Sequence, residues 1–230
     1  MIQFGDKIIS FDLIYQDRKT LGIKVNPDRS VQVRAPLNTS NEKIIETVKK
    51  RAAWILKQQS FFLAFEPLTP PRKYVNGETH LYLGRQYRLK IIKADKNRVK
   101  LYGKYFYVLT PHYEPEHVQE LLEEWYKKHA INKLNEYSQY WLEIFKKKNT
   151  VPTKIEIKKM TKRWGSCSPK GNILLNSELI KAPKGCIDYV IIHELCHLVH
   201  PNHNQAFFNL LSSYMPDWQI WKDRLERFLS

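Results

Sequence analysis

The first half of the chain alternates apolar and polar residues with a period of two, which is the pattern of β-strands that bury one face. The alternating stretches are 7–15, 21–25, 31–35, 79–83, 87–92, 98–102 and 105–109. In one stretch the apolar residues instead recur at helical spacing: Ile44, Ile45, Val48, Ala52, Ile55 and Leu56. The pattern therefore predicts a β-rich N-terminal region over residues 1–110, a twisted antiparallel sheet that carries one helix.

The second half begins with a long helical pattern. Its apolar residues recur at helical spacing through residues 114–148. Two short strand patterns follow at 154–158 and 171–176, and a buried helical pattern follows at 187–198. This order predicts an α+β protein whose second domain, residues 111–230, backs a buried helix with a short sheet.

The buried helix contains His193-Glu194-Leu195-Cys196-His197, which fits the H-E-x-x-H pattern of zinc hydrolases. Residues i and i+4 lie about 40° apart around a helix, so both imidazoles can face one metal ion. Glu194 stands next to the first ligand, where a carboxylate can take a proton from the attacking water. The motif therefore predicts a catalytic metal site with Glu194 as its base.

Two histidines leave such a site incomplete, because a catalytic zinc site usually has three protein ligands and a water. His200 lies seven residues after His193. That offset is about 10.5 Å along a helix, too far for all three imidazoles to converge on one ion. Pro201 disfavours helix at His200, so the chain turns there, and His203 follows at the third-ligand spacing of H-E-x-x-H-x-x-G-x-x-H. We therefore predict that Zn²⁺ is bound by His193, His197 and His203.

Composition limits the partners and the compartment. The 230 residues carry a formal net charge of +15 and have a pI near 9.6, which attracts nucleic acid, nucleotides or acidic protein surfaces. No apolar run reaches the ~20 residues that span a bilayer, and the N-terminus lacks the plan of a signal peptide. Three cysteines make no disulfide framework. We expect a cytoplasmic protein with no membrane partner.

Three functions fit these residues. A metallopeptidase would use Glu194 as base and would hold a peptide or protein substrate along an edge strand, for which Gly171–Asn176 is the candidate. A nucleoside triphosphate pyrophosphohydrolase or phosphatase would use the same metal on a phosphoanhydride, with Arg163 beside it. A nucleic-acid-binding or partner-binding module would close a structural metal site with His200 as a fourth ligand. The intact Glu194 favours an enzyme, and the sheet edge favours a peptide substrate.

Several motifs along the chain together resemble one protein family. They are Arg163-Trp164-Gly165-Ser166-Cys167, Leu175-Asn176, Pro183, Asp188-Tyr189-Val190-Ile191, His193-Glu194-Leu195-Cys196-His197-Leu198, Asn202-His203, Phe207 and Met215-Pro216-Asp217-Trp218, with Arg18-Lys19-Thr20 and Val31-Gln32-Val33-Arg34-Ala35-Pro36 near the N-terminus. Over essentially its whole length the chain resembles the YgjP-like metallopeptidases, which are related to the WLM and SprT-type proteases that act on DNA-associated proteins. The resemblance implies a minimal, gluzincin-like zincin core over residues 111–230, zinc at the three histidines and Glu194 as the catalytic residue.

Three side chains in or near these motifs have open roles. Arg163 and Asn176 are candidates for substrate binding, and Arg163 could hold a developing oxyanion or a phosphate. The alternative for residues 163–167 is a tight, well-packed turn. Cys167 is either a zinc ligand that keeps the enzyme latent or a small buried thiol. Asp217 is the alternative third metal ligand.

Overall fold

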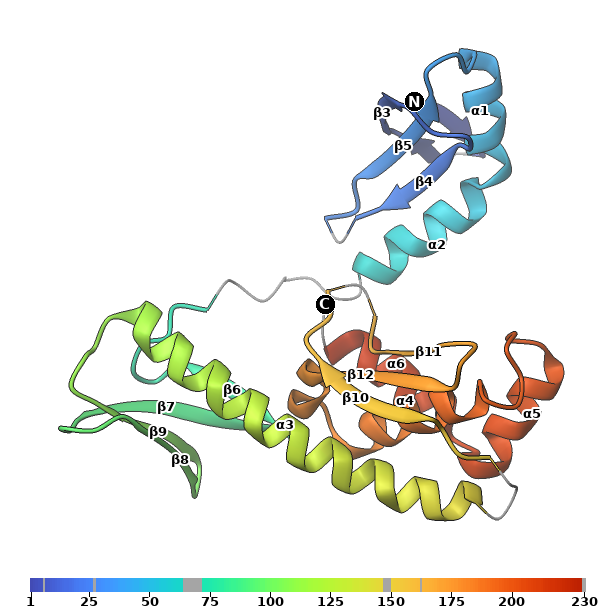
Figure 1. Ribbon diagram of the computed structural model, residues 1–230. Helices are drawn as coiled ribbons and strands as arrows, with labels where there is room; N and C mark the ends of the chain where they lie inside the picture. The colour runs from blue at the N-terminus through green and yellow to red at the C-terminus, as the bar shows by residue number, and fades with distance from the viewer. Residues whose placement is uncertain (6, 27, 64–71, 147–149, 162, 229–230) are drawn as a thin grey trace. The chain divides into compact units, whose positions relative to one another are not determined.

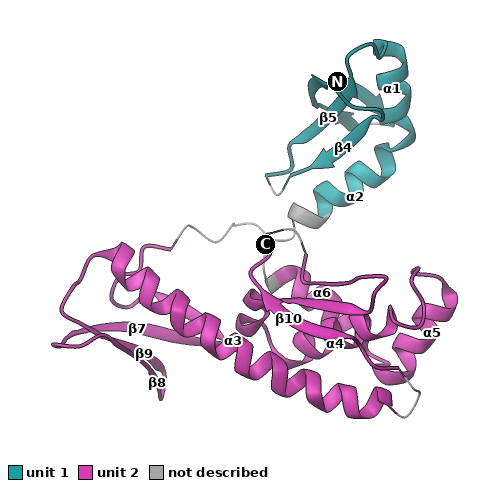
Figure 2. Cartoon of the chain, in the orientation of Figure 1, with its two compact units in different colours: residues 1–70, 230 teal, residues 71–229 magenta. Residues whose placement is uncertain are grey.

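The computed structural model describes residues 1–5, 7–26, 28–63, 72–146, 150–161 and 163–228, and the chain divides into two compact units, residues 1–70 and 71–229 (Figures 1 and 2). The sequence pattern predicts a boundary after residue 110. The strands between residues 79 and 110 instead belong to the second unit, because their buried face packs on the long helix of that unit.

The first unit is a small sheet covered by helices. Strands β3 (Asp12–Gln16), β5 (Val31–Pro36) and β4 (Gly22–Val25) form a sheet in that order, with β3 parallel to β5, and β1 (Ile2–Phe4) pairs with β2 (Lys7–Ile9). The prediction of one helix in this unit is wrong, because the structure has two. The chain turns at Arg51, so the apolar stripe is shared by α1 (Asn41–Lys50) and α2 (Ala52–Leu63). The core of this unit includes Val33, Ala35, Ile44, Val48 and Ile55.

The second unit begins with a four-stranded sheet. Its strands are β6 (Thr79–Tyr82), β7 (Arg85–Lys93), β8 (Arg98–Tyr102) and β9 (Tyr105–Thr110), in the order β6-β7-β9-β8. The β8–β9 turn at Gly103, which has a φ of 57°, folds β9 back between β7 and β8, so β9 runs parallel to β7. The single antiparallel sheet that we expected is therefore wrong, since the strands before residue 110 form separate sheets and two of these contain a parallel pair.

The predicted long helix is confirmed as α3 (Pro115–Lys146), and α+β is the fold class. Apart from the β1–β2 pair, the third sheet of the described residues has the order β10-β12-β11. It is formed by β10 (Lys154–Lys158), β11 (Gly165–Cys167) and β12 (Asn172–Asn176). β12 is the central strand, with β10 parallel to it on one side and β11 antiparallel on the other. The predicted edge strand Gly171–Asn176 is therefore the middle of the sheet, and β11 is an edge.

The helix α4 (Lys184–Cys196) packs between α3, the third sheet and the C-terminal helices α5 (Gln205–Tyr214) and α6 (Trp218–Phe228) (Figure 1). The 3₁₀ turn η1 (Ser177–Lys181) leads from β12 into α4. Most side chains of α4 are buried all round the helix, including Ile187, Ile191, Ile192, Leu195 and Cys196. A helix enclosed on every side is held rigidly, which suits an element that carries a site. Among the described residues, no helix combines the length and the apolar character needed to cross a membrane.

Candidate metal centre

The end of α4 and the turn after it bring three histidines together. The helix ends at Cys196, and one more turn follows it, in which the His200 N–H donates to the Cys196 carbonyl at 2.9 Å directly before Pro201. The side chain of Asn204 then caps α5 by accepting a hydrogen bond from the Phe207 N–H at 2.9 Å. These two local devices fix both ends of the segment that carries His203.

The ring nitrogens of His193, His197 and His203 converge, with one nitrogen of each lying within 4.8 Å of the others. The Nε2 atoms of His203 and His193 are 3.0 Å apart. His197 is oriented by its Nδ1 atom, which lies 3.2 Å from the His200 carbonyl oxygen, so its Nε2 is free to ligate. The buried Phe207 ring lies against all three imidazoles, with centroid distances of 4.7 to 5.0 Å, and forms an apolar wall.

The three other candidate ligands, His200, Asp217 and Cys167, lie outside this cluster. His200 contributes its main-chain carbonyl to the orientation of His197, while its imidazole is not part of the group. Asp217 accepts a hydrogen bond from Trp221 Nε1 at 2.8 Å. Of the six residues considered as ligands from the sequence, the structure therefore groups three.

The surroundings keep His193 and His197 neutral, which is the form that binds metal. Burial, and then the neighbouring His197 and His203, lower the pKa of His193 to about 3. Burial also lowers the pKa of His197, although its hydrogen bond to the His200 carbonyl opposes the shift. Neither imidazole has to lose a proton near pH 7 before it can bind a cation.

This donor set fits a zinc ion. Three neutral imidazoles with a water are a known catalytic zinc environment. Two nitrogens that bind one tetrahedral zinc at about 2.0–2.1 Å lie about 3.3 Å apart, close to the separation of the His193 and His203 nitrogens. Two imidazole nitrogens facing each other at that distance in a partly buried pocket are better satisfied by a shared cation than by each other.

Glu194 lies beside the cluster, on the side of α4 that packs against β11. Its side chain is buried, and its Oε2 atom has no hydrogen-bond partner among the described residues. Burial raises the pKa of Glu194 to about 7, and the positive charge of Arg163 acts in the opposite direction. A carboxyl group with a pKa near neutrality can both take and give a proton at the working pH.

Gly165 on β11 makes room for this carboxylate. A Cβ atom on Gly165 would lie 2.6 Å from Glu194 Oε1 and 2.7 Å from its Cγ, closer than real contacts allow. We did not identify Gly165 from the sequence. The tight turn considered for residues 163–167 is instead the strand β11 at Gly165–Cys167, and without that strand nothing in the sequence indicated the close approach of Gly165 to Glu194.

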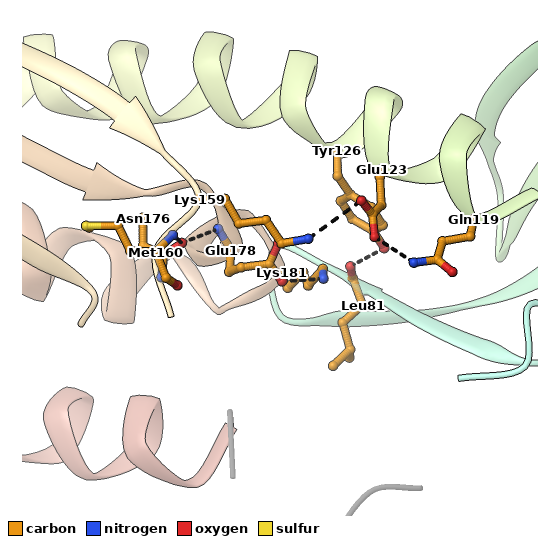
Figure 3. Close-up of polar contacts among 9 residues, drawn as sticks. All are labelled: Leu81, Gln119, Glu123, Tyr126, Lys159, Met160, Asn176, Glu178 and Lys181. Atoms are coloured by element: carbon orange, nitrogen blue, oxygen red, sulfur yellow. Dashed lines mark hydrogen bonds and ion pairs between the residues drawn. The ribbon is translucent and has the colours of Figure 1, made fainter. Parts of the chain in front are cut away.

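Arg163 and Asn176 are placed differently. Arg163 lines the pocket that contains the three histidines and Glu194, a cavity of about 920 Å³. Asn176 is only 2% exposed and is not among the residues that line this pocket. Its amide nitrogen donates to the carbonyls of Met160 and Arg163 at 2.8 and 3.0 Å. Its oxygen accepts from the N–H groups of Met160 and Glu178 at 3.2 and 3.1 Å (Figure 3). Asn176 thus fixes the backbone from which Arg163 extends.

Cys167 also lines this pocket, on the same strand as Gly165. Burial, with a smaller contribution from the charge of Glu194, raises the pKa of its thiol. Its sulfur donates to the Ser168 carbonyl at 3.6 Å, and Cys167 is not part of the histidine cluster. The structure therefore places Cys167 as a half-buried thiol in the wall of the pocket.

Comparison with known families gives one match. A family model described as a YgjP-like metallopeptidase domain matches residues 19–228, nearly the whole chain. A comparison with curated proteins finds no match. A metallopeptidase domain is a hydrolase domain that requires a metal ion, commonly zinc, and the three histidines are candidates to bind it. The chain belongs to the YgjP-like family of metallopeptidase-domain proteins.

Proposed function

We propose that this protein is a zinc-dependent peptidase that binds an extended segment of a peptide or protein along the free edge of β11. His193, His197 and His203 would hold the ion, and Glu194 would carry the proton. The observation that carries the proposal is that β11 is an edge strand in the wall of the same pocket as the histidines.

The hydrogen bonds of β11 define which of its groups are available. The Trp164 carbonyl accepts from the Asn176 N–H at 2.8 Å, and the Ser168 N–H donates to the Asn172 carbonyl at 2.9 Å. In an antiparallel pair, successive residues direct their N–H and C=O groups alternately toward the partner strand and away from it. Since residues 164 and 168 bond to β12, Gly165 and Cys167 direct these groups away from β12. An extended peptide can pair with these groups, and its scissile bond would then lie beside Glu194.

Glu194 is suited to move the proton. Hydrolysis adds water across the peptide bond, with the hydroxyl going to the carbonyl carbon and the proton to the amide nitrogen. Glu194 would take the proton from the attacking water and deliver it to the leaving nitrogen. A bound zinc ion would supply Lewis acidity and lower the pKa of a bound water towards ~7. Arg163, which lines the same pocket, would stabilise negative charge on the carbonyl oxygen.

A second candidate is hydrolysis of a nucleoside triphosphate at the same site. The pocket contains the cationic side chains of Arg163 and Lys170, whereas Glu194 is its one carboxylate among the described lining residues. A phosphoanhydride would use both cations. This candidate leaves the open edge of β11 without a role, and for that reason we place it second.

A purely structural metal is the third alternative. Such sites usually have four protein ligands. Within the described part of the chain, the metal-ligating groups that converge at this point are the three histidines alone. A three-histidine site with an adjacent buried carboxylate has the composition of a catalytic centre.

The test measures metal and turnover on one purified sample. Wild type, Glu194→Gln and the control Glu143→Gln, an exposed residue on α3, are analysed for zinc. The same samples are then assayed on casein and on a nucleoside triphosphate panel, with and without DNA. We expect about one zinc per chain in all three and casein cleavage in all but Glu194→Gln. Triphosphate turnover that depends on Glu194, without casein cleavage, would select the second candidate. Zinc without any turnover that depends on Glu194 would reject both enzymes.

A further inference from the structure

The sheet formed by β6 to β9 has one buried face and one exposed face. Phe106, Leu89 and Val108 are buried on the side that packs on α3. Because side chains alternate along a strand, the residues between them point to the opposite side. The exposed face is therefore formed by Arg88, Lys90 and Ile92 of β7, Arg98, Lys100 and Tyr102 of β8, and Tyr105, Tyr107 and Leu109 of β9.

The strand register arranges these nine side chains in rows. Lys90 and Lys100 flank Tyr107 in one row. In the next row, Tyr105 lies between Arg88 on β7 and Tyr102 on β8. Neighbouring strands are about 4.8 Å apart, so in both of these rows cations lie at contact distance from aromatic rings.

The charge of this face is of one sign. Residues 85–110 contain eight lysines and arginines and a single acidic residue, Asp95, which lies in the turn between β7 and β8. None of the four strands contains an Asp or a Glu. A solvated sheet face normally mixes both signs, because opposite charges on neighbouring strands stabilise the sheet. The absence of carboxylates from these strands leaves the cations available to an anionic ligand.

One tyrosine of this face is fully accessible, and the other two are partly exposed and held in place. Tyr102 is 78% exposed on the edge strand β8. Lys90 places its ammonium group 3.9 Å from the ring centroid of Tyr105 and 5.7 Å from that of Tyr107. A cation over the aromatic face fixes both rings against the sheet without any apolar cover.

We propose that this exposed face of β7, β8 and β9 binds single-stranded nucleic acid. Proteins that bind single strands combine cations that contact the phosphates with aromatic side chains on which unpaired bases stack, and both are interleaved on this face. A duplex keeps its bases stacked inside the helix, so it would use the cations but not the exposed ring of Tyr102. The inference is independent of the metal centre, since it uses none of the residues of that site.

The test is fluorescence anisotropy of labelled single-stranded DNA, single-stranded RNA and the matching duplex, titrated with the full chain over a range of salt. Arg98→Glu with Lys100→Glu should weaken single-strand binding by at least about tenfold and lower the log–log salt slope by about 1.4, for two lost phosphate contacts. Tyr102→Ala should weaken it by about 5- to 100-fold with the slope unchanged, because it removes stacking and no charge.

The control is Lys43→Glu with Lys57→Glu, which makes the same change in net charge at exposed positions of α1 and α2. It should bind within about threefold of wild type. Thermal melting checks that every variant is folded. Absence of saturable binding by the wild type would overturn the proposal, as would equal weakening by the control. Unchanged binding of Tyr102→Ala would also overturn it and would mark a general polyanion or acidic-protein surface.

Discussion

Gly165 and Glu194 are in direct contact across the gap between β11 and α4, and a methyl group on Gly165 would lie 2.6 Å from Glu194 Oε1. The glycine therefore sets the position of the carboxylate relative to the histidines. The strand proposed to bind the substrate and the residue proposed to transfer the proton are adjusted to each other through this single contact.

The first prediction concerns that contact. Gly165→Ala should lower kcat by at least about tenfold with zinc content unchanged, because the new methyl group displaces Glu194 from its working position. In the Glu194→Gln background the same substitution should add little further loss, since the group that it displaces is already inactive. Equal losses in both backgrounds would mean that Gly165 acts in some other way. Zinc analysis and casein hydrolysis on the four proteins give the answer.

The second prediction separates two neighbouring histidines. His203→Ala should weaken zinc binding by at least about 100-fold, because it removes one of three ligands. His200→Ala should leave zinc affinity within a few fold, since His200 acts through its main-chain carbonyl. Competition with a chromogenic chelator measures both affinities. A larger loss of zinc affinity for His200→Ala than for His203→Ala would show that His203 is not the third ligand.

The third prediction concerns the pH dependence of stability in the metal-free chain. The folded pKa of Glu194, about 7, lies above its ordinary value of 4.5, so the folded state binds more protons between these values. Stability therefore falls as pH rises through this window. Glu194→Gln should raise the free energy of unfolding at pH 8 by on the order of 2–3 kcal/mol and have little effect at pH 4.

Chemical denaturation in the presence of a chelator at the two pH values measures this difference. Glu143→Gln, at an exposed site on α3, should show no such pH-dependent gain. If Glu194→Gln stabilises the protein equally at both pH values, the gain does not come from ionisation of Glu194. That result would contradict the prediction that the buried charged carboxylate destabilises the folded state.

The fourth prediction concerns Asn176. Asn176→Ala should destabilise the second unit by about 2–4 kcal/mol, because it removes the four hydrogen bonds by which this buried side chain joins Met160, Arg163 and Glu178. Asn172→Ala, at the other end of β12, is the matched control and should cost far less. At a temperature where Asn176→Ala remains folded, KM should change less than stability does. A raised KM with unchanged stability would contradict this prediction and would indicate that Asn176 binds the substrate.

The local features of the site could be predicted from the sequence. The i, i+4 spacing of His193 and His197 follows from helical geometry, and Pro201 indicates the turn that returns His203. The long helix α3 was equally visible, because its apolar period extends over many turns. Each of these predictions depends on residues that are close together in the chain.

What could not be predicted depends on partners that are distant in the chain. Strand order is one example, because nothing in the sequence of Gly171–Asn176 shows that β10 and β11 will flank it. The contact of Gly165 with Glu194 and the bonds of Asn176 to the segment at 160–163 are further examples. The break at Arg51 was missed for another reason: the apolar stripe continues across it, so hydrophobic period alone shows one helix.

The ligand cluster spans only eleven residues of the chain, from His193 to His203, whereas Gly165 approaches Glu194 from well upstream. Closing a short loop costs little conformational entropy, so the three imidazoles can gather as soon as the end of α4 forms. The contact of Gly165 with Glu194 joins residues 29 positions apart, so it requires the closure of a longer loop and forms more slowly. If the three histidines bind zinc as proposed, the chain can therefore bind its ion before β11 packs on α4 and brings Gly165 against Glu194, so metal binding would precede completion of the proposed active site.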